Sequence, residues 1–215
     1  MAAIFERAGA ATVANLLAAL LGCCSTAQAF TVNIAAANPR TIFLQVGVGS
    51  FSGGNYNAGG TPANNATVNV VSVTVPAASV GSGVAQAMTT NSTASQSPYD
   101  GFVFCNLPGQ LYIGGFYRST TNTGAATVRA TSPANLVNAG GQTIPFNQIS
   151  WTSSGNGDTG AQPFPAGTFV GGSQTIGSIN RNQWAESCHT FSYANSSVVA
   201  AGTYTGRVTY TLSTP

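Results

Sequence analysis

The side chains that could act as acids, bases or metal ligands are few in this sequence. Beyond residue 29 the acids are Asp100, Asp158 and Glu186, and His189 is the only histidine of the chain. Glu186 and His189 come closest together, on either side of Cys188. Because the side chains of a strand alternate between its two faces, residues three apart are predicted to point to opposite sides. This spacing supports neither general acid–base chemistry nor a metal site, so we expect no catalytic residues, no metal and no cofactor.

The first 29 residues have a different character from the rest of the chain. Residues 11–22 form an apolar run too short to span a bilayer, and residues 27–29 read Ala-Gln-Ala, with small residues on both sides of Gln. This pattern is typical of a cleaved secretory signal peptide. We expect a signal peptide at residues 1–29, a secreted mature chain from Phe30, and no transmembrane segment in it.

The four cysteines fit an exported protein. Cys23 follows Leu20-Leu21-Gly22, which resembles a lipobox, so acylation of Cys23 is an alternative to cleavage after Ala29. Cleavage after Ala29 leaves Cys105 and Cys188 in a compartment where disulfides persist. We expect a bridge between these two, which would stabilise the fold by roughly 4 kcal/mol in the chain-entropy model. Two buried free thiols are the alternative.

The charge content limits the classes of partner. Only 5% of residues are charged and the net charge is +2, against roughly 25% charged residues in an ordinary soluble domain. No basic patch can be built from so few charges, which argues against nucleic acid and anionic membrane surfaces as partners. Low charge also weakens the repulsion between copies of a protein, so self-association is expected.

Short apolar runs separated by turns rich in Gly, Pro and Asn make up the chain after residue 29. Apolar and polar residues that alternate with a period of two indicate half-buried strands. We predict strands at residues 30–34, 41–48, 67–75, 102–105, 111–117, 127–131, 144–151, 169–170, 176–179, 191–193 and 203–212. No amphipathic helix is indicated after Gly22. The pattern predicts an all-β protein, with one antiparallel β-sandwich domain over residues 30–215.

The clearest alternation is in the last of these runs. Polar residues at odd positions alternate with Tyr204, Val208, Tyr210 and Leu212, which should face the core of a closing strand. We expect the strand at 191–193 to pair with it. Earlier in the chain, the parity of the valines shifts between Val70 and Val71, which indicates a bulge or a strand covered on both faces.

Residues 201–211, Ala-Gly-Thr-Tyr-Thr-Gly-Arg-Val-Thr-Tyr-Thr, resemble the final strand of the spore coat U and archaic chaperone–usher group of secreted bacterial pilin-like subunits. The resemblance implies an immunoglobulin-like sandwich that lacks one strand, which the N-terminal segment of the next subunit supplies. Here Phe30, Val32, Ile34 and Ala36 are the candidate donor residues, because every second side chain would enter the groove. Alternatively, residues 30–34 are the first strand of a complete monomeric sandwich.

These observations predict a structural protein of the periplasm, cell surface or extracellular space: a pilus, fimbrial or coat subunit that assembles by β-strand addition. Its expected partners are copies of itself, other pilin-like subunits and a periplasmic chaperone. The alternative is an exported carbohydrate-binding or adhesive module that uses the long loop at residues 50–65. For that role the candidate exposed aromatic residues are Tyr56, Tyr99, Tyr112, Tyr117 and Trp184.

Overall fold

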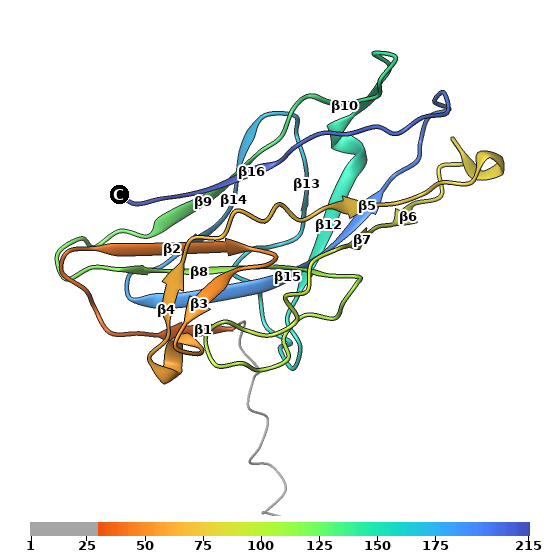
Figure 1. The fold of residues 1–215 in the computed structure, drawn as a ribbon. Coiled ribbons are helices and arrows are strands. Elements are labelled where there is room, and N and C mark those ends of the chain that lie inside the picture. The colour runs from red at the N-terminus through yellow and green to blue at the C-terminus, as the bar shows by residue number, and fades with distance from the viewer. Residues whose placement is uncertain (1–29) are drawn as a thin grey trace, which may run out of the picture.

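The computed structural model describes residues 30–215, which are all-β with three short 3-10 turns (Figure 1). The predicted signal peptide and the lipobox cysteine lie outside the described residues. The strands are β1 (Thr31–Asn33), β2 (Thr41–Val46), β3 (Ser50–Ser52), β4 (Thr61–Ala63), β5 (Val71–Ser72), β6 (Gln86–Ala87), β7 (Thr89–Thr90), β8 (Leu111–Arg118), β9 (Ala126–Thr131), β10 (Asn135–Val137), β11 (Thr143–Pro145), β12 (Ile149–Ser154), β13 (Gly167–Thr168), β14 (Ser173–Ile179), β15 (Gln183–Tyr193) and β16 (Thr209–Ser213). The 3-10 turns are η1 (Tyr56–Ala58), η2 (Ala77–Ser79) and η3 (Phe146–Gln148). No helix within residues 30–215 is long and apolar enough to cross a membrane.

The larger sheet is built on β15, its longest strand. Its main order is β13-β12-β15-β8-β2, and every neighbouring pair is antiparallel. β8 pairs with the first half of β15 on one side, and β12 pairs with its second half on the other. β1 pairs with the first half of β15, along the same edge of β15 that β12 pairs with further on. β6 pairs with the last two residues of β15.

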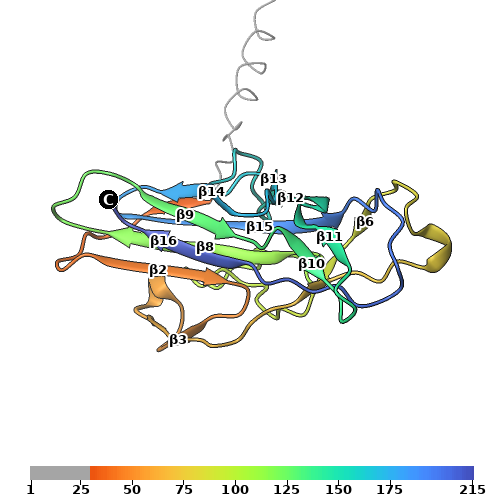
Figure 2. The same ribbon diagram turned by 90° about the horizontal axis from the view of Figure 1, so that it is seen from above.

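A second, three-stranded antiparallel sheet, in the order β14-β9-β16, faces the first and makes the fold a sandwich (Figure 2). The β10–β11 hairpin extends this side of the molecule, since Val137 of β10 bridges to Thr205 ahead of β16. Two further two-stranded ladders, β3–β4 and β5–β7, lie outside the two sheets. An antiparallel β-sandwich is therefore present, as the alternation predicted.

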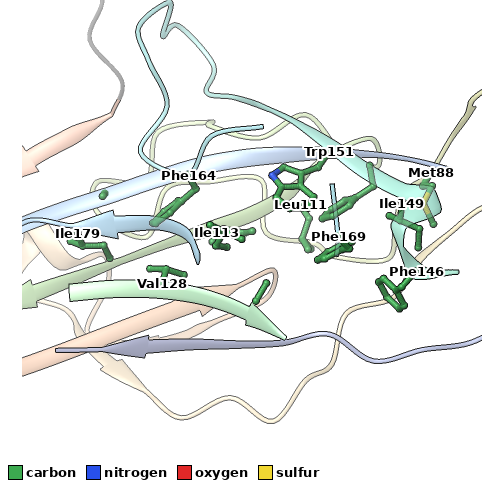
Figure 3. Close-up of a cluster of buried hydrophobic side chains, with 14 of the residues drawn as sticks. Met88, Leu111, Ile113, Val128, Phe146, Ile149, Trp151, Phe164, Phe169 and Ile179 are labelled. Atoms are coloured by element: carbon green, nitrogen blue, oxygen red, sulfur yellow. The ribbon is translucent and has the colours of Figure 1, made fainter. Parts of the chain in front are cut away.

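The main core fills the space between the two sheets (Figure 3). Ile113 of β8 and Trp151 of β12 come from the larger sheet, while Val128 of β9 and Ile179 of β14 come from the smaller one. Phe164 reaches the same core from the loop before β13 and is fully buried. A sheet-on-sheet core of this kind supplies the apolar burial that holds an antiparallel sandwich together.

The predicted strands in the middle of the chain are largely present. β8, β9, β12 and β14 cover most of the runs predicted at 111–117, 127–131, 144–151 and 176–179. The 144–151 run is divided, because η3 (Phe146–Gln148) interrupts it before β12 begins. The prediction at 169–170 is displaced, since β13 ends at Thr168, although Phe169 is buried in the core.

Two apolar runs are not the long strands that their composition suggested. Within residues 67–75 only β5 makes ladder pairs, with β7. Val71, Val73 and Val75 pack against the core, while Val68 and Val70 are exposed. The change from even-numbered to odd-numbered valines therefore marks the point where the segment reaches the core.

Residues 102–105 form a loop with a single bridge, from Val103 to Gln96. Phe102 and Val103 are each 51% exposed, so the prediction of a buried strand there is wrong. Only Phe104 and Cys105 of this run are buried, because they pack against Tyr112 and Cys188, and their amides bond to the carbonyl of Ser95 rather than to a ladder partner.

The end of the chain corrects the prediction of a terminal strand pair. Phe191 and Tyr193 belong to β15 in the larger sheet, whereas β16 pairs with β9 in the smaller one. The connection between them therefore crosses from one sheet to the other. The alternating run predicted at 203–212 also becomes a regular ladder only from Thr209.

Candidate functional site

The candidate donor segment forms β1 within its own chain. Thr31 lies opposite Ala185 and Asn33 opposite Gln183, so three register pairs attach it to β15. The ring of Phe30 packs 5.6 Å from that of Phe104. Like Phe30, Val32 and Ile34 are half-buried, whereas Ala36 is exposed and its carbonyl accepts a hydrogen bond from Arg118.

The residues predicted to face the core from the closing strand do lie against it. Tyr204, Val208, Tyr210 and Leu212 are half-buried and pack on the main core. β16 pairs with β9 along one edge, and its other edge has no ladder partner among residues 30–215. The backbone groups of that edge are thus open to pairing.

A second unpaired edge lies on the same side of the sandwich. β2 pairs only with β8, and β16 lies close to β2 across the opening between the sheets. A groove of about 320 Å³ follows β2 and is closed on its far side by residues 63–67. We call this the edge groove. It places exposed Ile42 and the outer edge of β2 beside a hollow.

The predicted disulfide joins Cys105 to Cys188 with a Cα separation of 5.5 Å, and both cysteines are buried. Cys188 lies in β15, and Cys105 ends the loop that leads toward β8. Around the bridge, Phe104 and Tyr112 form a small second core, with Phe30 packed against it. The bridge therefore fixes the 93–110 loop onto the outer face of the larger sheet, the face that points away from the sandwich core.

Glu186 and His189 point to opposite faces of β15, as their spacing predicted. Glu186 is fully buried on the outer face, where its Oε2 accepts hydrogen bonds from Tyr112 Oη at 2.6 Å and from Trp184 Nε1 at 2.8 Å. Its Oε1 is buried without a hydrogen-bond partner. Burial raises the pKa of Glu186 to about 7, and it raises the pKa of Tyr112 well above its usual value.

His189 is buried on the inner face, where its ring stacks on that of Trp151 with centroids 5.7 Å apart. Its Nε2 lies 3.0 Å from the carbonyl oxygen of Phe164, so this nitrogen carries the proton and donates. Burial lowers the pKa of His189 to about 4, which keeps the ring neutral near pH 7. Within residues 30–215 no three His, Cys, Asp or Glu side chains are grouped as metal ligands.

Three of the five aromatic residues considered for an exposed platform are core residues. Tyr112, Tyr117 and Trp184 are fully buried, and only Tyr56 and Tyr99 are partly exposed. Trp184 lies at the centre of an outer aromatic cluster, with ring centroids 5.3 Å from Tyr56 and 5.6 Å from Tyr99. The other members of this cluster are Phe43, Phe51 and Phe116. The aromatic side chains thus cover the back of the larger sheet instead of offering a free surface.

The predicted long loop at 50–65 is an ordered arm that contributes two aromatic side chains to this cluster. It consists of the β3–β4 hairpin with η1 at its tip, and it brings Phe51 and Tyr56 onto Trp184. Sequence reasoning missed this outer core and the burial of Glu186. The available signal was parity: Glu186 shares its face of the strand with Trp184 and Cys188, both of which are usually buried.

Comparisons of the chain with protein-family models, with curated proteins and with solved structures found no match.

Proposed function

We propose that this protein is a structural surface protein, a pilus, fibre or coat subunit with an immunoglobulin-like sandwich that assembles by β-strand addition. The observation that carries the proposal is the pair of unpaired edges, β2 and β16, which end the two sheets on the same side of the sandwich, with the edge groove running along β2. An unpaired edge offers a row of backbone donors and acceptors to an added strand.

In the proposed assembly, residues 30–36 of one subunit leave β15 and enter the open side of the next. β1 has only three register pairs with β15, so few ladder bonds must be given up, together with the packing of Phe30 on the second core and the hydrogen bonds from Arg118 to the carbonyls of Ala35 and Ala36. Phe30, Val32 and Ile34 alternate with polar residues, which lets apolar side chains enter the groove while the backbone pairs. Copies of the chain, related pilin-like subunits and a periplasmic chaperone are the proposed partners, and export by the signal peptide is part of the proposal.

The low charge of the chain supports this assignment. With 5% charged residues, association of copies meets little electrostatic repulsion. The exposed Ile42, at 47% exposure, would be covered by an added strand, and its burial would contribute to the stability of the assembly.

The test compares the chain that begins at Phe30 with a chain that begins at Thr41, by size exclusion and electron microscopy. The longer chain should form oligomers or fibres. The shorter chain should stay monomeric and bind a synthetic peptide of residues 30–38, with circular dichroism confirming that it keeps its β-structure. Monomeric behaviour of both chains, with no peptide binding, would contradict strand addition.

A point substitution tests the acceptor edge. Ile42→Lys places a charged side chain on the unpaired edge of β2 and should abolish assembly, because an edge lysine opposes strand pairing. Val198→Lys is the matched control, since Val198 is an exposed valine in the connection between β15 and β16. If both variants lost assembly equally, the added charge would prevent assembly wherever it is placed, and the β2 edge would not be the acceptor.

A further inference from the structure

A second groove, of about 420 Å³, lies on the outer face of the larger sheet. We call it the outer groove. One wall is the β3–β4 arm, with Phe51 and Asn55, and the other is the loop at residues 93–101. Gln45 of β2 and Gly49 line it between these walls. Its volume falls within the roughly 300–1,000 Å³ range of small-molecule sites.

The two walls of the outer groove are fastened to each other and to the sheet. The amide of Tyr56 donates to the carbonyl of Pro98 at 2.9 Å, and that of Asn57 donates to the carbonyl of Tyr99 at 2.7 Å. The carbonyl of Ser95 accepts from the amides of Phe104 and Cys105, and the Cys105 bridge anchors this loop to β15. A groove with walls fixed in this way loses little conformational entropy when it binds a ligand.

The lining has neutral polar groups together with an aromatic ring. Amide side chains come from Gln45, Asn55 and Gln96, and hydroxyls come from Thr93 and Ser95. Phe51 and Pro98 add apolar surface, and none of the lining residues carries a charge. A charged ligand would lose solvation here without gaining a countercharge, so a neutral ligand is favoured.

Gln45 supplies an unused acceptor in this groove. Its side chain is only 6% exposed, and its Nε2 donates to the carbonyl of Gly47 at 2.9 Å. Its Oε1 is buried with no hydrogen-bond partner. A side chain at position 49 would overlap that amide, so a glycine at 49 is what gives Gln45 its room. A buried amide oxygen left without a donor is costly, and a donor group that comes close to it would relieve that cost.

We propose that the outer groove binds a neutral carbohydrate unit. Each sugar hydroxyl both donates and accepts, so it can pair with the accessible amide and hydroxyl groups of the lining. The ring of Phe51 packs on those of Phe43 and Trp184, and the part of its half-buried side chain that lines the groove is left for the apolar ring carbons of a sugar. The outer groove is separate from the strand addition proposed above and does not depend on it.

The experiment records amide NMR spectra of the ¹⁵N-labelled exported protein during titration with D-mannose, D-galactose and N-acetyl-D-glucosamine. D-glucuronate and tri-alanine serve as charged and peptide probes. At least one neutral sugar should shift the signals of residues 93–98 and the side-chain amides of Gln45, Asn55 and Gln96. Glucuronate should shift them much less. The proposal is overturned if none of the three sugars shifts these signals, or if glucuronate or tri-alanine shifts them as strongly.

Exposed residues of the groove provide the variants. Gln96→Ala and Thr93→Val should each weaken binding of the sugar about fivefold, the factor expected for one lost hydrogen bond. Thr152→Val is the matched control, because Thr152 is an exposed threonine on β12, away from this groove. Signals outside the groove should stay unchanged and so show that the variants fold. Full affinity in both groove variants, or equal weakening in the control, would refute the site.

Discussion

Glu186 and His189 should give the free energy of unfolding opposite pH dependences that nearly cancel in the native protein. The folded pKa of Glu186 is about 7 against an ordinary 4.5, so the native state binds this proton more tightly than the unfolded state does. The resulting stability is fully present below pH 4.5 and is lost as the pH rises toward 7. His189 behaves oppositely: its pKa is lowered from 6.5 to about 4, so stability is present above pH 6.5 and is lost as the pH falls toward 4.

The two effects are of similar size. Each pKa differs from its ordinary value by about 2.5, and at about 1.4 kcal/mol per pH unit each contributes about 3 kcal/mol. Between pH 4.5 and 6.5 the loss from Glu186 and the gain from His189 therefore offset each other. The free energy of unfolding of the native protein should be nearly constant over this interval.

Single substitutions should reveal the separate slopes. Glu186→Gln keeps an oxygen that accepts from Tyr112 and Trp184 but removes the titration. Its stability should rise by about 3 kcal/mol from pH 4 to pH 6.5, as His189 loses its proton in the unfolded state. His189→Gln keeps an N–H donor for the carbonyl of Phe164. The stability of this variant should fall by about the same amount from pH 4.5 to pH 7.

Urea unfolding at half-unit steps of pH measures these profiles, with intrinsic tryptophan fluorescence as the signal. The double variant is the control and should again give a flat profile, at lower stability. A flat profile for either single variant would refute the assigned burial of that group. A slope of the same sign in both variants would show that other ionisable groups control the pH dependence.

Three further variants test the outer face. Replacing both Cys105 and Cys188 by serine should lower the free energy of unfolding by about 4 kcal/mol, because the bridge closes a long loop across a sequence separation of 83. Urea unfolding under non-reducing conditions measures this difference in free energy. Gly114→Ala should lower the free energy of unfolding by about 1–3 kcal/mol, because a Cβ at 114 would overlap the Tyr112 hydroxyl that bonds Glu186. Gly140→Ala is the control and should change little, because a Cβ at this loop glycine meets no atom closer than 3.5 Å. Tyr112→Phe should raise the pKa of Glu186 further, since it removes a hydrogen bond to the carboxylate. NMR titration of the Glu186 side chain measures this pKa, and an unchanged or lowered value would contradict the prediction.

The fold class could be predicted from the sequence because local alternation reports which face of a strand is buried. Residues 127–131 and 209–212 alternate cleanly, and they form β9 and most of β16 with the expected inward residues. Pairing partners could not be read in the same way. Phe191 and Tyr193 looked like a partner for β16, but alternation in one strand carries no information about which sheet it joins.

The outer face could not be predicted because both faces of the larger sheet are covered. In β8 and in residues 184–189 of β15 nearly every residue is buried, so hydrophobicity does not distinguish the two faces. The covering layer consists of the β3–β4 arm and the loop around Cys105, whose small polar residues gave no sign of a buried role. Tyr112 and Trp184 were therefore only candidates for an exposed platform, although both are fully buried under this layer.

The two proposed functions use neighbouring parts of the molecule that meet at the end of β2. The main core on the inner face of β15 holds the sandwich together, and the unpaired edges of β2 and β16 lie beside that core. The outer face carries the disulfide, Glu186 and the outer groove. The two grooves share Gln45, Val48 and Gly49 of the chain that leads out of β2. A strand added along β2 would therefore contact residues that also line the outer groove, so sugar affinity measured in assembled and monomeric protein should differ if both proposals hold.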